Sequence, residues 1–313
     1  MGIAAYLQKP VRQSQLHDCL TAVMASAGSE QITVSKLVTQ HSLRESQVHE
    51  KDKTLLSVRV LVAEDNPVNQ KVALAQLYNL GYHAEAVPNG LVLLQALEMR
   101  PADIILMDCQ MPEMDGFAAT AEIRRREGRA RHTIIIAMTA NAFDGDHKIC
   151  LAAGMDDYLS KPVKAEVLRQ KLERWTKPDV PGKGLSKGTA AAQHTGGSVI
   201  DQAQLAGLRE IQQPGESDLV TELIDLFLNE SASQLKALRE AVIDNDTVEL
   251  RRLAHLLKGS SANIGARSMA DLYEEMEGPD RPNGEGVALF ARIEKEFAVV
   301  SEALKAERRG IHE

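Results

Sequence analysis

Between residues 58 and 176, short apolar runs alternate with amphipathic stretches, and this alternation most narrows the folds open to the chain. Four short runs have strand character, and they cover residues 58–63, 103–108, 133–139 and 157–161. Between them, three stretches carry apolar residues at helical spacing: Pro67–Leu80, Gly90–Met99 and Phe117–Arg126. Strands that alternate with helices predict a parallel sheet with helices on both faces.

Each of these four strands ends at a charged or hydroxyl-bearing side chain. Glu64 and Asp65 follow the first, Asp108 ends the second, Thr139 ends the third and Lys161 ends the fourth. In a parallel sheet the carboxyl ends of the strands share one edge, where ligands bind. Three carboxylates crowded there repel one another and call for a hard cation such as Mg²⁺, which prefers oxygen ligands. One carboxylate can then attack a phosphoryl group, while positive charge offsets the charge on the transferring oxygens.

These residues lie in four stretches, VLVAEDNPVNQKVA, DIILMDCQMPEMDG, AMTANA and GMDDYLSKP, that resemble the signature stretches of response-regulator receiver domains, especially those of hybrid histidine kinases. The resemblance covers residues 58–176 and implies an α/β flavodoxin-like fold with a five-stranded parallel sheet. It implies Asp108 as the phospho-acceptor. Mg²⁺ would be held by Glu64, Asp65, Asp108 and the backbone carbonyl of Gln110.

The same resemblance assigns roles to the last two strand ends. Thr139 would hydrogen-bond the phosphoryl group, Lys161 would pair with it, and Pro162 would follow a cis peptide bond. Tyr158 matches the switch aromatic of the family, which turns inward on phosphorylation. The plainer interpretation, a half-buried aromatic at a strand end, stays open for Tyr158.

After residue 199 every segment has a helical pattern. The expected helices are Ile200–Ile211, Leu219–Ile243, Asp246–Ile264, Ala266–Glu277 and Glu285–Glu307, the third capped by Asp244 or Asp246. Several amphipathic helices with short joins predict an all-α four-helix bundle. In the third helix the buried stripe comprises Leu250, Leu253, Ala254, Leu257, Ser261 and Ile264. His255 falls just off this stripe, on the wetter face.

Lys258 and Gly259 lie three and four residues after His255 and share its helix face. A neutral imidazole can attack a phosphoryl group, and a nearby ammonium attracts phosphate oxygens. A helical glycine costs about 0.5–1 kcal/mol relative to alanine, so its presence suggests that another protein must come close. The run HLLKGSSANIGA resembles the signature of histidine-phosphotransfer (HPt) domains, and this resemblance covers residues 198–308. It implies that His255 is phosphorylated, that Lys258 and Gly259 support docking, and that Ser260 and Asn263 assist.

An internal repeat bears on the N-terminus. Residues 2–20 match residues 154–172 at eight of nineteen positions. We therefore expect residues 1–27 to be a truncated remnant of a first receiver domain, its last strand and helix, and Met1 need not be the natural start. An N-terminal helix packed on the next domain is the alternative. Residues 28–57 and 177–199 are polar or rich in Gly and Pro and predict linkers, leaving domains at 58–176 and 200–308.

Charge and composition exclude several classes of function. The net charge is −8, and residues 198–313 hold 22 acidic against 13 basic residues, which argues against nucleic-acid binding. Three scattered cysteines predict neither a disulfide framework nor a zinc site. No apolar run is long enough to insert in a membrane. Without glycine-rich nucleotide-binding boxes, we expect no use of ATP. We expect a cytoplasmic protein, or the cytoplasmic end of a membrane-bound sensor kinase.

Together the two signatures predict a phosphorelay intermediate. Phosphoryl groups would pass from an upstream histidine kinase to Asp108, then to His255, then to the receiver domain of a downstream response regulator. Three alternatives stay open: a metal-dependent phosphatase or hydrolase of flavodoxin-like shape, a receiver read by contact while His255 is idle, and a reverse flow that drains phosphate through His255.

Overall fold

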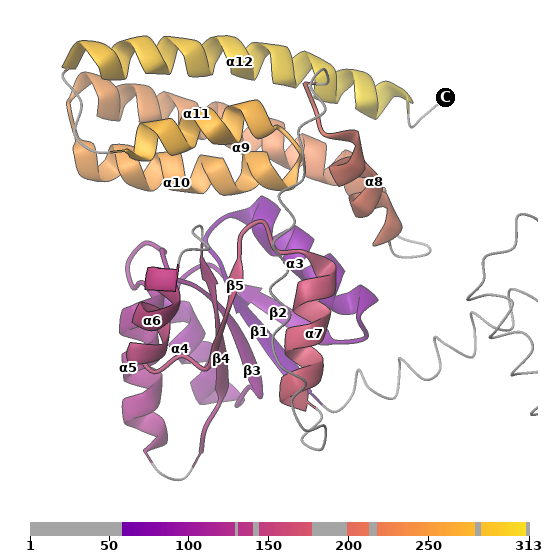
Figure 1. The fold of residues 1–313 in the computed structure, drawn as a ribbon, viewed down its shortest axis with the longest axis vertical. Coiled ribbons are helices and arrows are strands. Elements are labelled where there is room, and N and C mark those ends of the chain that lie inside the picture. The colour runs from indigo at the N-terminus through magenta and orange to yellow at the C-terminus, as the bar shows by residue number, and fades with distance from the viewer. Residues whose placement is uncertain are drawn as a thin grey trace, which may run out of the picture. The chain divides into compact units, whose positions relative to one another are not determined.

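The computed structural model describes residues 58–128, 131–139, 144–176, 199–212, 218–278 and 283–310. The predicted receiver remnant at 1–27 and the linker at 28–57 lie outside the described residues, as does almost all of the linker at 177–199. From Val58 onward the described residues form one compact unit, made of an α/β domain and a helical domain. Figure 1 shows the ribbon of both domains.

The α/β domain is built on five parallel strands in the order β2-β1-β3-β4-β5. The strands are β1 (Arg59–Ala63), β2 (His83–Val87), β3 (Ile104–Asp108), β4 (Ile134–Thr139) and β5 (Asp157–Ser160). This confirms the predicted five-stranded flavodoxin-like sheet. Strand β2 was not among the four apolar runs, because exposed His83 and Glu85 interrupt its apolar residues.

Helices cover both faces of the sheet, as the alternation predicted (Figure 1). Buried residues of α3 (Pro67–Asn79) and α7 (Ala165–Thr176) share a core with Val60 and Val62 of β1. Those of α4 (Gly90–Met99), α5 (Gly116–Glu127) and α6 (Asp144–Ala152) share the opposite core with Leu61 and Ala63. The division follows from the period of two in a strand, which sends successive side chains to opposite faces.

The helical domain contains α8 (Gln202–Glu210), α9 (Leu219–Ile243), α10 (Thr247–Asn263), α11 (Arg267–Glu277) and α12 (Asn283–Gly310). Helix α10 contacts α9 and α11, and α12 contacts the same two helices, so these four form the predicted bundle, with α8 against α9. Helix α10 begins after Asp246, whose side chain accepts hydrogen bonds from the backbone N–H groups of Val248 and Glu249. Of the two predicted caps, Asp246 is therefore the one used.

The two domains share apolar contacts along α3. Val68, Val72 and Ala75 of this helix are buried in the same cluster as Val220 and Leu223 of α9. Helix α3 contacts both α9 and α10. Because burial of apolar surface favours association, this continuous cluster holds the helical domain against the edge of the α/β domain.

Two of the three cysteines meet in the α/β core, although 41 residues separate them. The Sγ atoms of Cys109 and Cys150 lie 3.9 Å apart, and both thiols are buried and unbridged. Burial raises the pKa of Cys109, which keeps it a thiol at neutral pH. This pair belongs to the packing of the core.

Candidate functional site

Three carboxylates meet where β1 and β3 end. Oxygen atoms of Glu64, Asp65 and Asp108 all lie within 4.8 Å of one another, and Glu64 and Asp108 are each only 2% exposed. Strands β1 and β3 are hydrogen-bonded neighbours, so their ends bring the three acids together. Gly116 makes room beside them, because a Cβ there would stand 2.2 Å from the backbone oxygen of Asp108.

Lys161 reaches this cluster from the end of β5. Its Nζ lies 2.6 Å from Glu64 Oε2 and 2.6 Å from Asp108 Oδ2. Burial disfavours the charged ammonium, but attraction by the two carboxylates outweighs it and raises the pKa of Lys161. The peptide bond between Lys161 and Pro162 is cis, as predicted. The ends of β1, β3 and β5 thus bring one ammonium to three acids.

The charges in this cluster do not balance. Burial, with repulsion from Asp108, raises the pKa of Glu64 to about 7 and that of Asp65 to about 6. Lys161 alone cannot neutralise three carboxylates, and the side chains around them offer oxygen ligands. This donor set fits a hard divalent cation such as Mg²⁺, which prefers carboxylate oxygens and retains open positions. The backbone N–H of Gln110 donates to Asp108 Oδ1 at 3.2 Å, so this residue also adjoins the cluster.

The two remaining receiver-type residues lie nearby. Thr139 ends β4 and is buried, and its carbonyl oxygen accepts a hydrogen bond from the backbone N–H of Lys161 at 2.7 Å. Tyr158 is half-buried in β5, with its ring centroid 4.3 Å from that of His147 on α6. The phosphoryl contact of Thr139 and the switch role of Tyr158 stay predictions.

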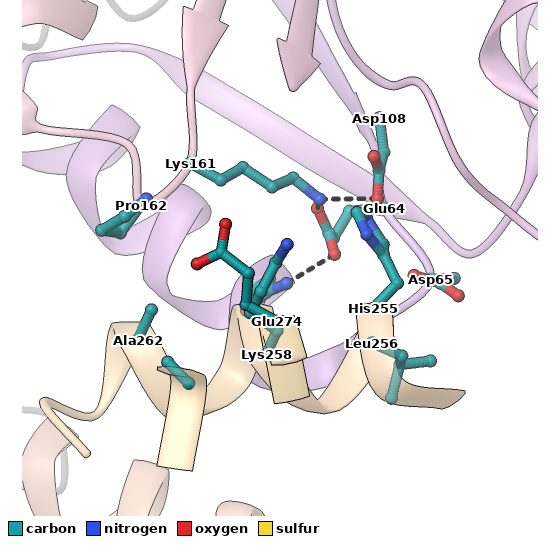
Figure 2. A pocket seen from close by; sticks show the side chains of 13 residues that line it. Glu64, Asp65, Asp108, Lys161, Pro162, His255, Leu256, Lys258, Ala262 and Glu274 are labelled. Atoms are coloured by element: carbon teal, nitrogen blue, oxygen red, sulfur yellow. Dashed lines mark hydrogen bonds and ion pairs between the residues drawn. The ribbon is translucent and has the colours of Figure 1, made fainter. Parts of the chain in front are cut away.

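His255 faces the acid cluster from the helical domain. A cavity of about 150 Å³ is lined by Glu64, Asp65, Asp108 and Lys161 on one side and by His255 and Lys258 on the other. Figure 2 shows His255 rising from α10 toward Glu64 and Asp108. The His255 side chain is 15% exposed, so the ring is neither sealed in the bundle nor open to bulk water. The structure therefore brings the histidine and the acids to one space.

Glu277 of α11 contacts both His255 and Lys258 of α10. Its Oε1 lies 2.7 Å from His255 Nδ1, and its other oxygen binds the Lys258 ammonium. Partial burial opposes the charge on Glu277, but these two hydrogen bonds hold its pKa below its usual range. An ionised carboxylate only accepts hydrogen bonds, so Nδ1 carries a hydrogen, and in the neutral ring this tautomer leaves the lone pair on Nε2.

The predicted docking residues on α10 have different surroundings. Gly259 lies against Asn69 of α3, and Asn263 Nδ2 donates to Asn69 Oδ1 at 2.8 Å. Ser260 is buried, and its hydroxyl donates to the carbonyl oxygen of Leu257 at 3.1 Å, within its own helix. The contacts of Gly259 and Asn263 thus cross to the α/β domain, whereas a docking role for Ser260 stays a prediction.

Comparison with protein families matches both domains. Residues 60–173 match the response regulator receiver domain, and residues 222–303 match the Hpt domain. The chain has a receiver domain and an Hpt domain. The predicted wider boundaries, 58–176 and 200–308, remain predictions.

Two relatives that match most of the chain are histidine kinases. The chain is 32% identical over 266 residues to the sensor histidine kinase GacS of Pseudomonas protegens, which covers 83% of the chain and 28% of that protein. It is 29% identical over 277 residues to the signal transduction histidine-protein kinase BarA of Escherichia coli, with 88% and 28% covered. The chain therefore spans less than a third of either relative.

A solved structure is similar to the receiver domain alone. It is the receiver domain of sensor histidine kinase PA1611 from Pseudomonas aeruginosa, with a magnesium ion in its active-site cleft. The two are 47% identical, the match covers 38% of this chain and 96% of that one, and the TM-score is 0.35. In the part of this chain that the structure describes, no helix has the length and apolarity needed to cross a bilayer.

Sequence reasoning missed two side chains that complete the site. Asn69 lies within the NPVNQ part of a signature stretch, so its position was visible but its partner was not. Glu277 is 22 residues from His255 and on another helix, where no spacing rule links them. For such a residue the sequence carries no local signal.

Proposed function

We propose that this chain is a phosphorelay intermediate in which Asp108 of the receiver domain accepts a phosphoryl group and exchanges it with His255 of the Hpt domain. The observation that carries the proposal is the shared cavity, which Asp108, Lys161 and His255 line together. Placing a nucleophile beside its reaction partner removes much of the entropic cost of their encounter.

In the first step, an Asp108 carboxylate oxygen attacks the phosphorus of a phosphohistidine on an upstream histidine kinase. The N–P bond of the donor breaks, an O–P bond forms, and the donor imidazole leaves with the electron pair. Lys161, already within 2.6 Å of Asp108, offsets charge on the transferring oxygens. Glu64, Asp65, Asp108 and the carbonyl of Gln110 would hold Mg²⁺, which when bound supplies further positive charge at those oxygens.

In the second step, His255 Nε2 attacks the same phosphorus. The O–P bond breaks, an N–P bond forms, and the Asp108 carboxylate is restored. Glu277 keeps the hydrogen on Nδ1 and aligns the ring through its 2.7 Å contact. Lys258 lines the cavity on the Hpt side, where an ammonium attracts phosphate oxygens. The Hpt domain thus supplies the nucleophile with Glu277 and Lys258 beside it, and the receiver supplies the leaving carboxylate and the groups around it.

The remaining roles follow from these two steps. Thr139 would hydrogen-bond the phosphoryl group, and Tyr158 would respond to its presence. Phosphorylated His255 would then donate to the receiver domain of a downstream response regulator. The kinase relatives support an upstream histidine kinase as donor, and a cytoplasmic place for the chain accords with such a partner.

The test uses the full chain with Mg²⁺ and labelled acetyl phosphate, which phosphorylates carboxylates. In the unaltered chain we expect label on both Asp108 and His255, the latter lost in acid. We expect His255→Gln to retain label on Asp108 alone, and Asp108→Asn to lose label from both residues. Label on Asp108 that never reaches His255, or label on His255 in Asp108→Asn, would overturn the proposal.

A further inference from the structure

One side chain links the acid cluster directly to the Hpt domain. Asn69 Nδ2 donates to Glu64 Oε1 at 2.7 Å, and Asn69 Oδ1 accepts from Asn263 Nδ2 at 2.8 Å. Asn69 and Asn263 are buried, with 7% and 8% exposure. The amide of Asn69 therefore touches a carboxylate of the acid cluster at one end and the docked helix at the other.

Gly259 gives this amide its space. A Cβ at position 259 would stand 2.8 Å from Asn69 Nδ2, closer than real Cβ contacts allow. Gly259 lies inside α10 with ordinary helical backbone, so the space and not the backbone angle requires glycine. The nitrogen that would be pushed away is the one that binds Glu64. A side chain at this position would thus disturb the acid cluster as well as the interface.

Neighbouring contacts set the register in which α10 meets α3. Asn66 Nδ2 donates to the carbonyl oxygen of Leu256 at 3.0 Å, one helical turn before Gly259 and Ser260. Lys71, one turn further along α3, pairs with Glu222 of α9. These polar contacts flank the apolar cluster of α3, so a slipped register would break them together.

We propose that Asn69, Gly259 and Asn263 form a lock by which docking of the Hpt helix α10 holds the Asn69 amide against Glu64 and so fixes this carboxylate of the acid cluster in place. The occupant of the α3 face is this chain's own Hpt domain, which the contacts of α3 with α9 and α10 support. A helix without glycine at position 259, or without an amide side chain at position 263, would fit this face poorly. The contacts of the lock do not depend on phosphoryl transfer. Any effect of these contacts on transfer from Asp108 to His255 rests on the proposed function.

A cycle of variants of the full chain tests the lock: Gly259→Ala, Asn69→Ala and the two combined. The measurement is hydrogen–deuterium exchange of α3 and α10, which reports how often the interface opens. We expect Gly259→Ala to speed exchange about tenfold in the unaltered background, the size typical of coupled neighbours. With Asn69→Ala already present, adding Gly259→Ala should change nothing, because the atom that it meets is gone.

A matched control separates docking from helix stability. Gly207 in α8 has no heavy atom within 4 Å of a built Cβ, so Gly207→Ala should leave exchange in α3 and α10 unchanged. Alanine is the better helix former at both sites, so unfolding of the Hpt domain is not expected, and circular dichroism checks it. The lock is overturned if Gly259→Ala exchanges like the unaltered chain, or if it acts equally with and without Asn69.

Two further readouts identify the occupant and separate the two proposals. Protection of α3 should be independent of protein concentration, since the occupant belongs to the same chain, and protection that grows with concentration would instead assign the face to a second copy. The exchange cycle uses no phospho-donor. If the cycle behaves as expected while label never reaches His255, the lock stands and the proposed function fails. If label reaches His255 while Gly259→Ala exchanges like the unaltered chain, the lock fails and the function stands.

Discussion

In the receiver domain the reactive side chains come from the ends of strands far apart in the sequence, whereas in the Hpt domain they come from neighbouring turns of two helices. The side chains of Glu64 and Asp108 are buried, and both form ion pairs with Lys161, which is 12% exposed. The side chains of His255 and Lys258 are 15% exposed, and both contact Glu277. Burial raises the pKa of the receiver acid Glu64, whereas hydrogen bonds from His255 and Lys258 hold the pKa of the Hpt acid Glu277 below its usual range.

The largest effect that this comparison predicts is at Lys161. In Lys161→Met, phosphoryl transfer to Asp108 should fall about 100- to 1000-fold, because a preorganised positive charge is lost. The free energy of unfolding at pH 7.5 should also fall by about 3 kcal/mol, because two buried carboxylates lose their counter-ion. Labelling rates and denaturant unfolding measure the two effects.

Lys164→Met is the control for this variant, because Lys164 is exposed and lies three residues further on. It should change the free energy of unfolding by no more than about 0.5 kcal/mol. The rate of labelling should change by no more than the factor to which that free energy corresponds. If Lys161→Met unfolds like the unaltered chain, the acid cluster is not balanced by this ammonium and the contrast between the domains weakens.

The next effect concerns pH and Mg²⁺. Because the pKa values of Glu64 and Asp65 are raised to about 7 and 6, these groups favour the folded state at low pH. Their contribution is lost as pH rises through those values. Mg²⁺ must displace any bound protons, so its affinity should rise by up to about tenfold per pH unit for each proton released. Thermal unfolding with and without Mg²⁺, from pH 5 to pH 8, measures this.

We expect this coupling of Mg²⁺ binding to proton release in the receiver domain and not in the Hpt domain. The expected result is a small stabilisation by Mg²⁺ at pH 5 and a much larger one at pH 7.5. In Glu64→Gln the pH dependence of Mg²⁺ affinity should become shallower, because one titrating ligand has been removed. A stabilisation by Mg²⁺ that is equal at pH 5 and pH 7.5 would contradict the assignment of these acids as its ligands.

The smallest effect is expected on the Hpt side. Glu277→Gln retains a polar partner for His255 but removes the charge that holds the hydrogen on Nδ1. Transfer from Asp108 to His255 should slow about tenfold, within the range seen for partners that orient a catalytic group. Nitrogen NMR of the His255 ring should show a mixture of tautomers in place of one.

Glu274→Gln is the matched control for Glu277→Gln, since Glu274 lies on the same helix and lines the same cavity but is exposed. Its effect on transfer and on the His255 tautomer should be negligible. Equal slowing by both variants would assign the effect to the charge of α11 in general and not to the contact with Nδ1.

Much of the fold could be predicted because local patterns and tertiary burial agree. The buried stripe of α10 follows its helical period, and four of the five strands are apolar runs that end at the site. Strand β2 was not recognised because its apolar residues alternate with the exposed polar residues His83 and Glu85. The predicted boundaries of α4 and α9 coincide with the observed ones, and the other predicted helix ends lie within three residues of them, where caps and loop contacts decide the ends.

By itself, the sequence determined which candidate side chains lie together. A parallel sheet must bring strand ends to one edge, and a helix must put His255, Lys258 and Gly259 on one face, so these groupings follow from backbone geometry alone. Only the tertiary structure decided the partners of those groups. Asn69 meets Asn263 across 194 residues, and Glu277 meets His255 from another helix. Such contacts depend on how the formed helices and strands pack against one another. Residue spacing within one helix or strand does not encode that packing.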